Sequence, residues 1–115
     1  MTEGDVALAP LAQADGSVKN RPVILLRQMP PFGDWLVCGV STQLHQQVGG
    51  FDELIERSNP DFARSGLKAS SIIRLGYLAV LPVSALLGVI GSISQERQRR
   101  LLDRLSEHLR KQSPG

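Results

Sequence analysis

The sequence has few of the residues that build disulfide-bonded, metal-dependent or aromatic-lined proteins. It holds one cysteine, Cys38, so no internal disulfide can form and a reducing, cytoplasmic setting is expected. Aromatic residues make up only 4% of the chain, which argues against a peptide groove lined with aromatic rings. Its two histidines belong to no CxxC, HExxH or paired-carboxylate pattern, and no glycine-rich phosphate loop is present. No metal and no cofactor are expected.

Long apolar runs and a strong net charge are also missing. The most apolar stretch, residues 75–90, is interrupted by Pro82 and is shorter than the ~20 residues that span a bilayer. The first residues are acidic and lack the basic leader of a secretory signal, so neither export nor a membrane partner is expected. The formal net charge is +2, and nearly half of the basic residues lie in 96–111. Binding of nucleic acid would therefore depend on a few placed arginines.

The composition that is present predicts one globular domain of mostly β structure. The chain of 115 residues, with 42% hydrophobic and 21% charged residues, suits a single domain over 1–111 with a frayed tail at 112–115. Short strands between glycine or proline turns are predicted at 5–10, 22–26, 34–40, 70–75 and 77–80. A polar excursion over 43–65 would hold a helical turn or an edge strand. The pattern is typical of a small barrel or sandwich.

The region before the C-terminus carries the clearest local signals. Gly76 inside a strand-like run indicates a bulge or a close backbone approach. A short helix is predicted over 84–90 and a short strand over 91–93. Ser92 with Gln95 forms a capping-box pattern, with Ser94 as the rival cap of a final helix. That helix would pack by an apolar stripe and present its arginines to solvent, with local pairing to Asp103 and Glu107. The stripe consists of Leu101, Leu102, Leu105 and Leu109.

Several short pieces follow one another in an informative order along the chain. They are residues 3–6, the Arg-Pro segment 19–23, 41–43, 65–68 ahead of 71–75, and 90–94 before the final helix. Their order and spacing resemble the MazF/PemK toxin family. The resemblance implies an α+β, mostly β fold: an SH3-like small barrel of the MazF/PemK/CcdB type with a C-terminal helix. It also implies a homodimer, with the apolar run 75–90 as interface material. An antitoxin tail would fill the RNA groove.

The same resemblance implies a function and a set of site residues. The chain would be the toxin of a type II toxin–antitoxin system, a metal-independent endoribonuclease that cleaves single-stranded RNA and blocks translation. Arg21 matches the family's catalytic arginine, Ser41 a hydroxyl residue at the end of the third strand, and Arg74 a second arginine of PemK-like members. Further RNA contacts are expected from the polar residues near these positions, namely Lys19, Asn20, Thr42, Gln43 and His45.

The proton acceptor of such a reaction is left open. Arginine remains protonated and serine is a weak base, so His45 or Asp5 would have to take the proton of the 2′-hydroxyl group. PemK-like toxins can carry an aspartate two residues after the second arginine, and here that residue is Gly76. The alternative is therefore a non-catalytic nucleic-acid- or protein-binding module on the same fold. Bases would have to stack on Phe32, Trp35 or Phe51.

Overall fold

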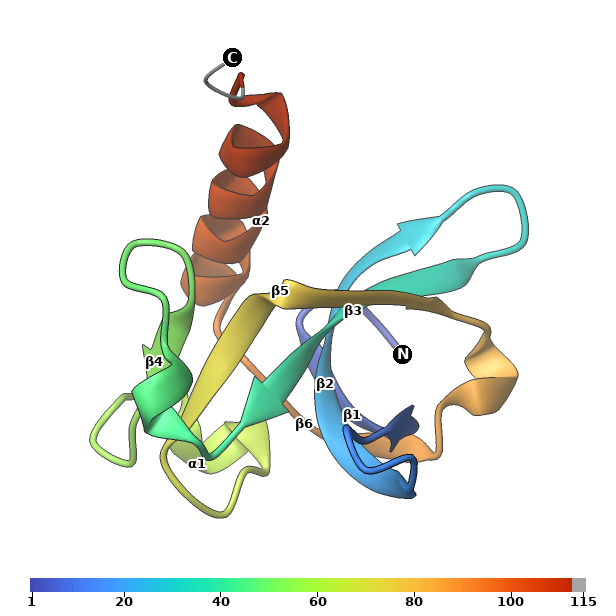
Figure 1. The fold of residues 1–115 in the computed structure, drawn as a ribbon, viewed down its shortest axis with the longest axis horizontal. Helices are drawn as coiled ribbons and strands as arrows, with labels where there is room; N and C mark the ends of the chain where they lie inside the picture. Colours follow the sequence, from blue (N-terminus) through green and yellow to red (C-terminus); the bar gives the residue numbers. More distant parts are fainter. Residues whose placement is uncertain (113–115) are drawn as a thin grey trace.

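Six antiparallel strands form one sheet that curls on itself, and a long C-terminal helix packs against it (Figure 1). The computed structural model describes residues 1–112. The sheet order is β4-β5-β3-β2-β1-β6. The strands are β1 (Asp5–Ala12), β2 (Val18–Met29), β3 (Asp34–Ser41), β4 (Glu53–Ile55), β5 (Ser71–Leu81) and β6 (Gly88–Ser92). The mostly β architecture with a C-terminal helix confirms the expected fold class. The predicted tail over 112–115 lies outside the described residues, except for Gln112.

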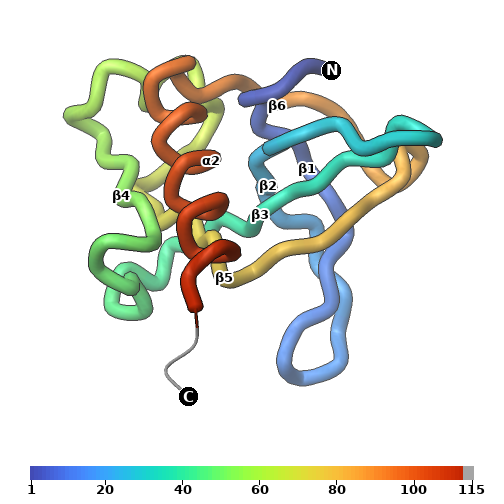
Figure 2. The backbone as a smooth tube through the Cα atoms, turned by 90° about the horizontal axis from the view of Figure 1, so that it is seen from above, coloured from blue at the N-terminus to red at the C-terminus, as the bar shows by residue number. Residues whose placement is uncertain are grey.

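Two α-helices and two 3₁₀ turns complete the chain. Helix α1 (Phe62–Ser65) lies in the excursion and α2 (Gln95–Arg110) ends the described fold. The turns are η1 (Leu44–Gln46) and η2 (Val83–Ala85). From above, α2 lies over the β4–β5 side of the sheet (Figure 2), and in Figure 1 its C-terminal turns extend away from the strands. Within residues 1–112, no helix combines the length and the apolar character needed to cross a membrane.

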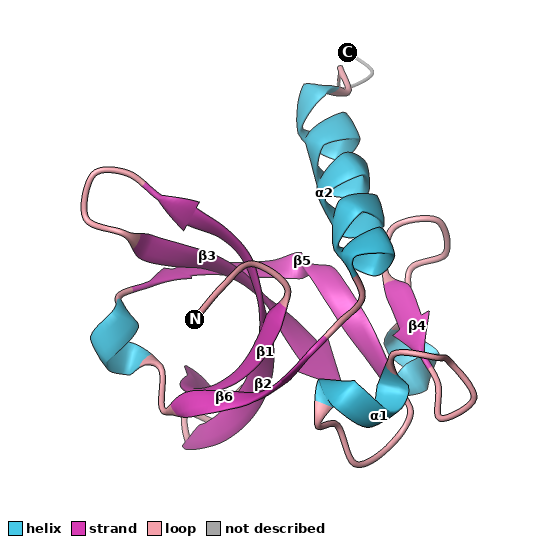
Figure 3. Ribbon diagram, turned by 180° about the vertical axis from the view of Figure 1, so that it is seen from behind, coloured by secondary structure: helices cyan, strands magenta, loops and turns pink. Residues whose placement is uncertain are grey.

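Strands β1, β2 and β3 are buried on both faces, which explains their short continuous apolar runs. Successive side chains of a strand point to opposite faces, so neighbouring residues enter different cores. Val6 and Ile24 pack into the core beneath α2, whereas Ala7 and Leu25 pack into the core enclosed by the curl of the sheet. Figure 3 shows from behind how β1, β2 and β6 turn away from β5 to enclose that second core. The predicted core strand at 22–26 is confirmed by complete burial from Val23 to Leu26.

A bulge divides the long strand β5. Cys38 pairs with Leu78, but the next residue of β3, Gly39, pairs with Arg74. Residues 75–77 are therefore extra residues on the β5 side, and the predicted irregularity at Gly76 is confirmed. The two strands predicted at 70–75 and 77–80 are one strand, because pairing to β3 continues on both sides of the bulge.

The excursion over 43–65 contains both of the elements that were left open, an edge strand (β4) and a helical turn (α1). Helix α1 ends at Gly66, which has φ of +75° and lies against the backbone of Ile90. Gly91 in turn lies against the backbone of Arg64 and Ser65, where any side chain would clash with carbonyl groups. The predicted helix over 84–90 is wrong: η2 is a single turn, and β6 begins at Gly88 because it pairs with β1.

Helix α2 corrects two further expectations. Its N-cap is Ser94, whose Oγ accepts a hydrogen bond of 3.1 Å from the Arg97 amide, so the capping box at Ser92 is wrong. Ser92 belongs to β6 and pairs with Asp5, which leaves it unavailable as a cap. Of the apolar stripe, Leu101 and Leu105 are buried, whereas Leu109 is 70% exposed because the helix end extends beyond the sheet.

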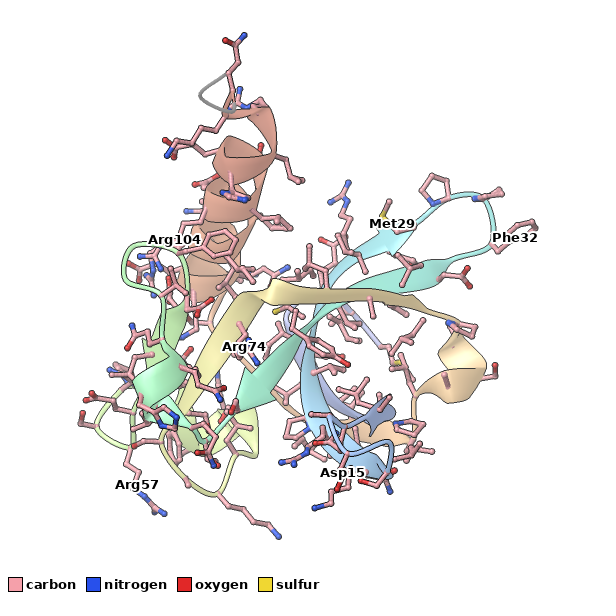
Figure 4. All side chains as sticks on the ribbon, viewed as in Figure 1. Asp15, Met29, Phe32, Arg57, Arg74 and Arg104 are labelled. Atoms are coloured by element: carbon pink, nitrogen blue, oxygen red, sulfur yellow. The ribbon has the colours of Figure 1, made fainter. Side chains whose placement is uncertain are left out.

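Three arginines of α2 do not lie on the expected solvated face, whereas Arg99 and Arg110 are exposed as expected. Arg97 is 5% exposed and donates to Asp61 Oδ2 at 2.8 Å and to Glu53 Oε1 at 2.7 Å. Arg100 donates to both Glu53 oxygens at 2.9 Å, and Arg104, labelled in Figure 4, lies 3.3 Å from Glu53. These ion pairs fasten α2 to β4 and to the loop before α1. We call Glu53, Asp61, Arg97, Arg100 and Arg104 the ionic cluster.

Candidate functional site

A pocket of about 400 Å³ opens between the β1–β2 hairpin, the end of β3 and the middle of β5. Its walls include Arg21 from β2, Ser41 from β3 and Arg74 from β5, the three residues for which the sequence analysis expected catalytic roles. Thr42 and Gln43, expected to contact RNA, also line it. Three side chains that are far apart in the sequence therefore lie around one space.

The strand order explains why these residues meet. Strand β3 lies between β2 and β5, so its C-terminal end is flanked by both. Gly39 pairs with Val23 on one side and with Arg74 on the other. Because the β2–β3 pair is antiparallel, Arg21, two residues before Val23, lies level with Ser41, two residues after Gly39. The bulge in β5 places Arg74 opposite Gly39, two residues from Ser41 along β3 and therefore on the same face of the sheet.

The three side chains differ in how tightly they are held. Arg21 is half-buried and its Nη2 donates a hydrogen bond of 3.0 Å to Gln13 Oε1, while Gln13 Nε2 donates to the Leu11 carbonyl at 3.0 Å. The Ser41 hydroxyl oxygen accepts a hydrogen bond of 3.1 Å from the Gln43 amide. Among residues 1–112, Arg74 makes neither an ion pair nor a side-chain hydrogen bond; it projects beside β5 and β3 in Figure 4. Its guanidinium group is available to a ligand.

Several expected residues lie outside the pocket wall. Lys19 and Asn20 are exposed on β2, where they pair with β1. His45 is exposed in η1, although its neighbour Gln46 lines the pocket. Asp5 accepts a hydrogen bond of 2.9 Å from the Thr2 amide at the opposite end of β1. Neither proposed proton acceptor, His45 nor Asp5, is part of the wall.

Three residues of the pocket wall with polar side chains were not expected from the sequence: Gln13, Gln46 and Tyr77. Gln13 lies in the hairpin turn, and only its contact with Arg21 distinguishes it from an ordinary polar turn residue. Tyr77 is the last residue of the bulge, and the glycine before it gave a usable signal, because a bulge often redirects a nearby side chain.

The electrostatic character of the pocket is simple. Among the described residues of its wall, the ionisable side chains are Arg21, Arg74 and Tyr77, and none is Asp, Glu or His. Hydroxyl and amide groups supply the remaining polar surface. Two guanidinium groups without an opposing carboxylate favour an anionic ligand, and the planar fork of arginine suits phosphate oxygens. Throughout residues 1–112, His, Cys, Asp and Glu side chains form no group of three or more suited to a metal ion.

Comparison with known proteins agrees with this architecture. A family model described as a PemK-like, MazF-like toxin of type II toxin-antitoxin systems matches residues 2–109. Among solved structures, the Mycobacterium tuberculosis toxin MazF-mt6 is similar, with a TM-score of 0.66 and 20% sequence identity. The match covers 95% of this chain and 99% of that one. At this identity the likeness concerns the fold. A search of curated protein sequences finds no significant match.

Proposed function

Because the chain belongs to the family of PemK-like, MazF-like toxins of type II toxin–antitoxin systems, we propose that it is an endoribonuclease that cleaves single-stranded RNA. The scissile phosphate would lie in the pocket between β2, β3 and β5. The observation that carries the proposal is the presence of Arg21, Ser41 and Arg74 on the wall of that one pocket. Cleavage of messenger RNA in the cytoplasm would block translation and arrest growth.

The proposed reaction uses the RNA's own 2′-hydroxyl group as nucleophile. The 2′-oxygen attacks the neighbouring phosphorus, the bond to the 5′-oxygen breaks, and a 2′,3′-cyclic phosphate forms. The attacking group loses its proton to solvent or to a base, and the 5′-oxygen gains one. Arg21 and Arg74 would bind the phosphate oxygens as negative charge builds up, and one such donor is typically worth ~3 kcal/mol of barrier. Ser41 would donate a hydrogen bond to the phosphate.

Preorganisation supports the assignment of Arg21. Its hydrogen bond to Gln13 holds the guanidinium group without the competition of a carboxylate, so its charge stays available to the phosphate. Arg74, without a described partner, would complete the pair when RNA binds. Catalysis by charge stabilisation is most effective when donors are held in place before the reaction.

Family membership supports two partners. The first is an antitoxin, whose disordered tail would compete with RNA for the pocket. The second is another copy of this chain. Exposed apolar side chains on the second half of β5 and on the segment after it would form the interface, including Val80, Val83 and Leu87, which are 49–57% exposed. A purely monomeric mass in light scattering would contradict the homodimer.

The nuclease is tested with purified protein and a fluorescent, mixed-sequence single-stranded RNA in the presence of EDTA. We expect cleavage by the wild type and a loss of about 100-fold for Arg21→Ala, as for removal of one transition-state donor. Arg27→Ala is the matched control, because Arg27 lies on the same strand but pairs with Glu3 at 3.2 Å, outside the pocket. Equal rates for wild type and Arg21→Ala would refute the role of Arg21.

A non-catalytic binder on the same fold is the second candidate, and Gly76 favours it. A Cβ at this exposed position would have only Phe51 within contact distance, at 4.0 Å, so an aspartate would fit there but is missing. If expression of Arg21→Ala arrested growth as the wild type does, while neither protein cut RNA, this candidate would replace the nuclease.

A further inference from the structure

The pocket contains one aromatic side chain, and it is not one that the sequence analysis expected to stack on bases. Phe32 is 86% exposed at the tip of the β2–β3 hairpin, far from Arg74 (Figure 4). Trp35 is 3% exposed in the core, and the Phe51 ring lies 4.7 Å from that of His108. Within the part of the chain that the structure describes, Tyr77 alone presents a ring to the pocket.

The position of this ring is set by the backbone. Tyr77 is the last of the extra residues of the β5 bulge, so it lies close to Arg74 across from Gly39. A Cβ at Gly39 would be 3.1 Å from Tyr77 Cδ1 and 3.3 Å from Cγ, so the ring rests directly on the glycine backbone. The ring is half-buried and packs at the edge of the second core. It is therefore held in place with part of its surface left open.

The groups around the ring match the parts of a nucleotide. Two guanidinium groups suit the phosphate, an aromatic face suits a base, and the side-chain amides of Gln43 and Gln46 can donate to and accept from base edges. A volume of about 400 Å³ lies within the range of small-ligand sites, ~300–1,000 Å³. A simple anion would use the two guanidinium groups but not the ring.

We propose that Tyr77 is the base-binding residue of this site: the nucleobase next to the phosphate held by Arg21 and Arg74 stacks on the Tyr77 ring. The inference rests on the proposed function, since it assumes that the pocket takes RNA. It assigns recognition of one base to the ring and leaves the chemical step to the arginines. The Tyr77 hydroxyl group has no part in it.

The test measures binding separately from cleavage. The probe is a fluorescein-labelled, mixed-sequence single-stranded RNA with 2′-fluorine in place of each 2′-hydroxyl, which has no nucleophile and stays intact. Anisotropy titrations compare Tyr77→Phe, which keeps the ring, with Tyr77→Leu, which removes it. Phe32→Leu is the matched control, because it removes an exposed ring outside the pocket. We expect Kd within twofold of wild type for Tyr77→Phe and Phe32→Leu, and about tenfold weaker for Tyr77→Leu.

A second measurement needs no substitution at the site. The chain has one tyrosine, so protein made with 3-fluorotyrosine gives a single ¹⁹F NMR resonance. Stacking of a base should shift this resonance when the 2′-fluoro RNA is added. Saturable binding without a shift would overturn the proposal, whatever the folding of the Leu variant.

The outcomes separate this inference from the nuclease. If Tyr77→Leu binds as tightly as the wild type, stacking is refuted while cleavage of ordinary RNA can still stand. If Tyr77→Phe loses as much affinity as Tyr77→Leu, the hydroxyl group and not the ring makes the contact, and the proposal fails. A wild type that binds the probe but never cuts ordinary RNA refutes the nuclease and leaves stacking supported by the Leu variant. No binding by the wild type refutes stacking, and cleavage of ordinary RNA then decides the nuclease by itself.

Discussion

At the scale of single residues, burial changes what a charged side chain does. Arg97 lies on a helix rich in arginines, yet its side chain is 6% exposed and contacts two carboxylates. Burial raises the pKa of Asp61, but hydrogen bonds from Arg97 and from the Ser94 amide outweigh it and bring the pKa to about 2. Asp61 therefore depends on Arg97 for its ion pair, whereas Glu53 also pairs with Arg100 and Arg104.

Arg97→Ala should be far more costly than loss of a surface arginine. It leaves the buried Asp61 carboxylate without its ion-pair partner and Glu53 with two of its three arginines, and breaking a buried ion pair typically costs ~3–5 kcal/mol. The free energy of unfolding from urea denaturation measures the effect. Arg110→Ala, at the exposed end of the same helix, should change it by less than ~0.5 kcal/mol. Similar small losses for both variants would show that the ionic cluster contributes little.

At the scale of elements, strand pairing decides which residue can cap a helix. Ser92 and Ser94 both precede α2, and each has the side chain that a cap requires. Ser92 is held in β6 by pairing with Asp5, so the chain leaves the sheet only after it. Ser94, with φ of −69° and ψ of 153°, has the extended conformation of a cap, and its Oγ accepts a hydrogen bond from the Arg97 amide.

Alanine at the two serines should separate these roles. Ser94→Ala removes the cap and should lower the free energy of unfolding by ~1 kcal/mol. Ser92→Ala should have the smaller effect, because its side chain caps nothing. Urea denaturation followed by the circular dichroism of α2 compares the two variants with the wild type. A greater loss for Ser92→Ala would mean that the helix begins two residues earlier in solution.

At the scale of the whole molecule, two contacts between segments far apart in the sequence hold α1 and α2 against the curled sheet. Gly66 and Gly91 let α1 lie directly against β6, and the ionic cluster joins α2 to β4. The excursion therefore belongs to the folded body, and the pocket keeps its shape because β3 and β5 are fixed on both sides. The free energy of unfolding should therefore fall when the carboxylates of the ionic cluster become protonated.

Acid should unfold this protein through the ionic cluster. Burial raises the pKa of Glu53, but hydrogen bonds and charges from Arg100, Arg97 and Arg104 bring it below the ordinary value. With the pKa of Asp61 also lowered, from 3.8 to about 2, the folded state binds fewer protons than the unfolded state. The stabilisation is therefore complete above pH ~5 and is lost as the pH falls through ~4 toward ~2.

Urea denaturation midpoints at pH 7, 5 and 3 measure this dependence. We expect little change between the first two and a clear fall at the third. Asp61→Asn should be less stable at pH 7 and should lose less between pH 5 and pH 3 than the wild type does. If the denaturation midpoint of this variant fell between pH 5 and pH 3 by as much as that of the wild type, other carboxylates would be responsible.

A feature could be predicted from the sequence when it depends on neighbouring residues, and not when it depends on contacts with distant segments. The core strand at 22–26, the bulge at Gly76 and the helix stripe at Leu101 and Leu105 are local patterns, and the structure contains each of them. The capping serine, the extent of β6 and the partners of Arg97 were misjudged, because pairing with distant strands overrides local preference.

The amino-acid sequence by itself determined the succession of strands and turns along the chain, the terminal helix and the family resemblance. Each of these depends on residues that are neighbours in the sequence. Only the tertiary structure decided that Arg21, Ser41, Arg74 and Tyr77 share one pocket, and that His45 does not. Their meeting depends on β3 lying between β2 and β5 and on a three-residue bulge in the register. The order of the strands within the sheet and their register come from contacts between distant segments, and no local pattern encodes them.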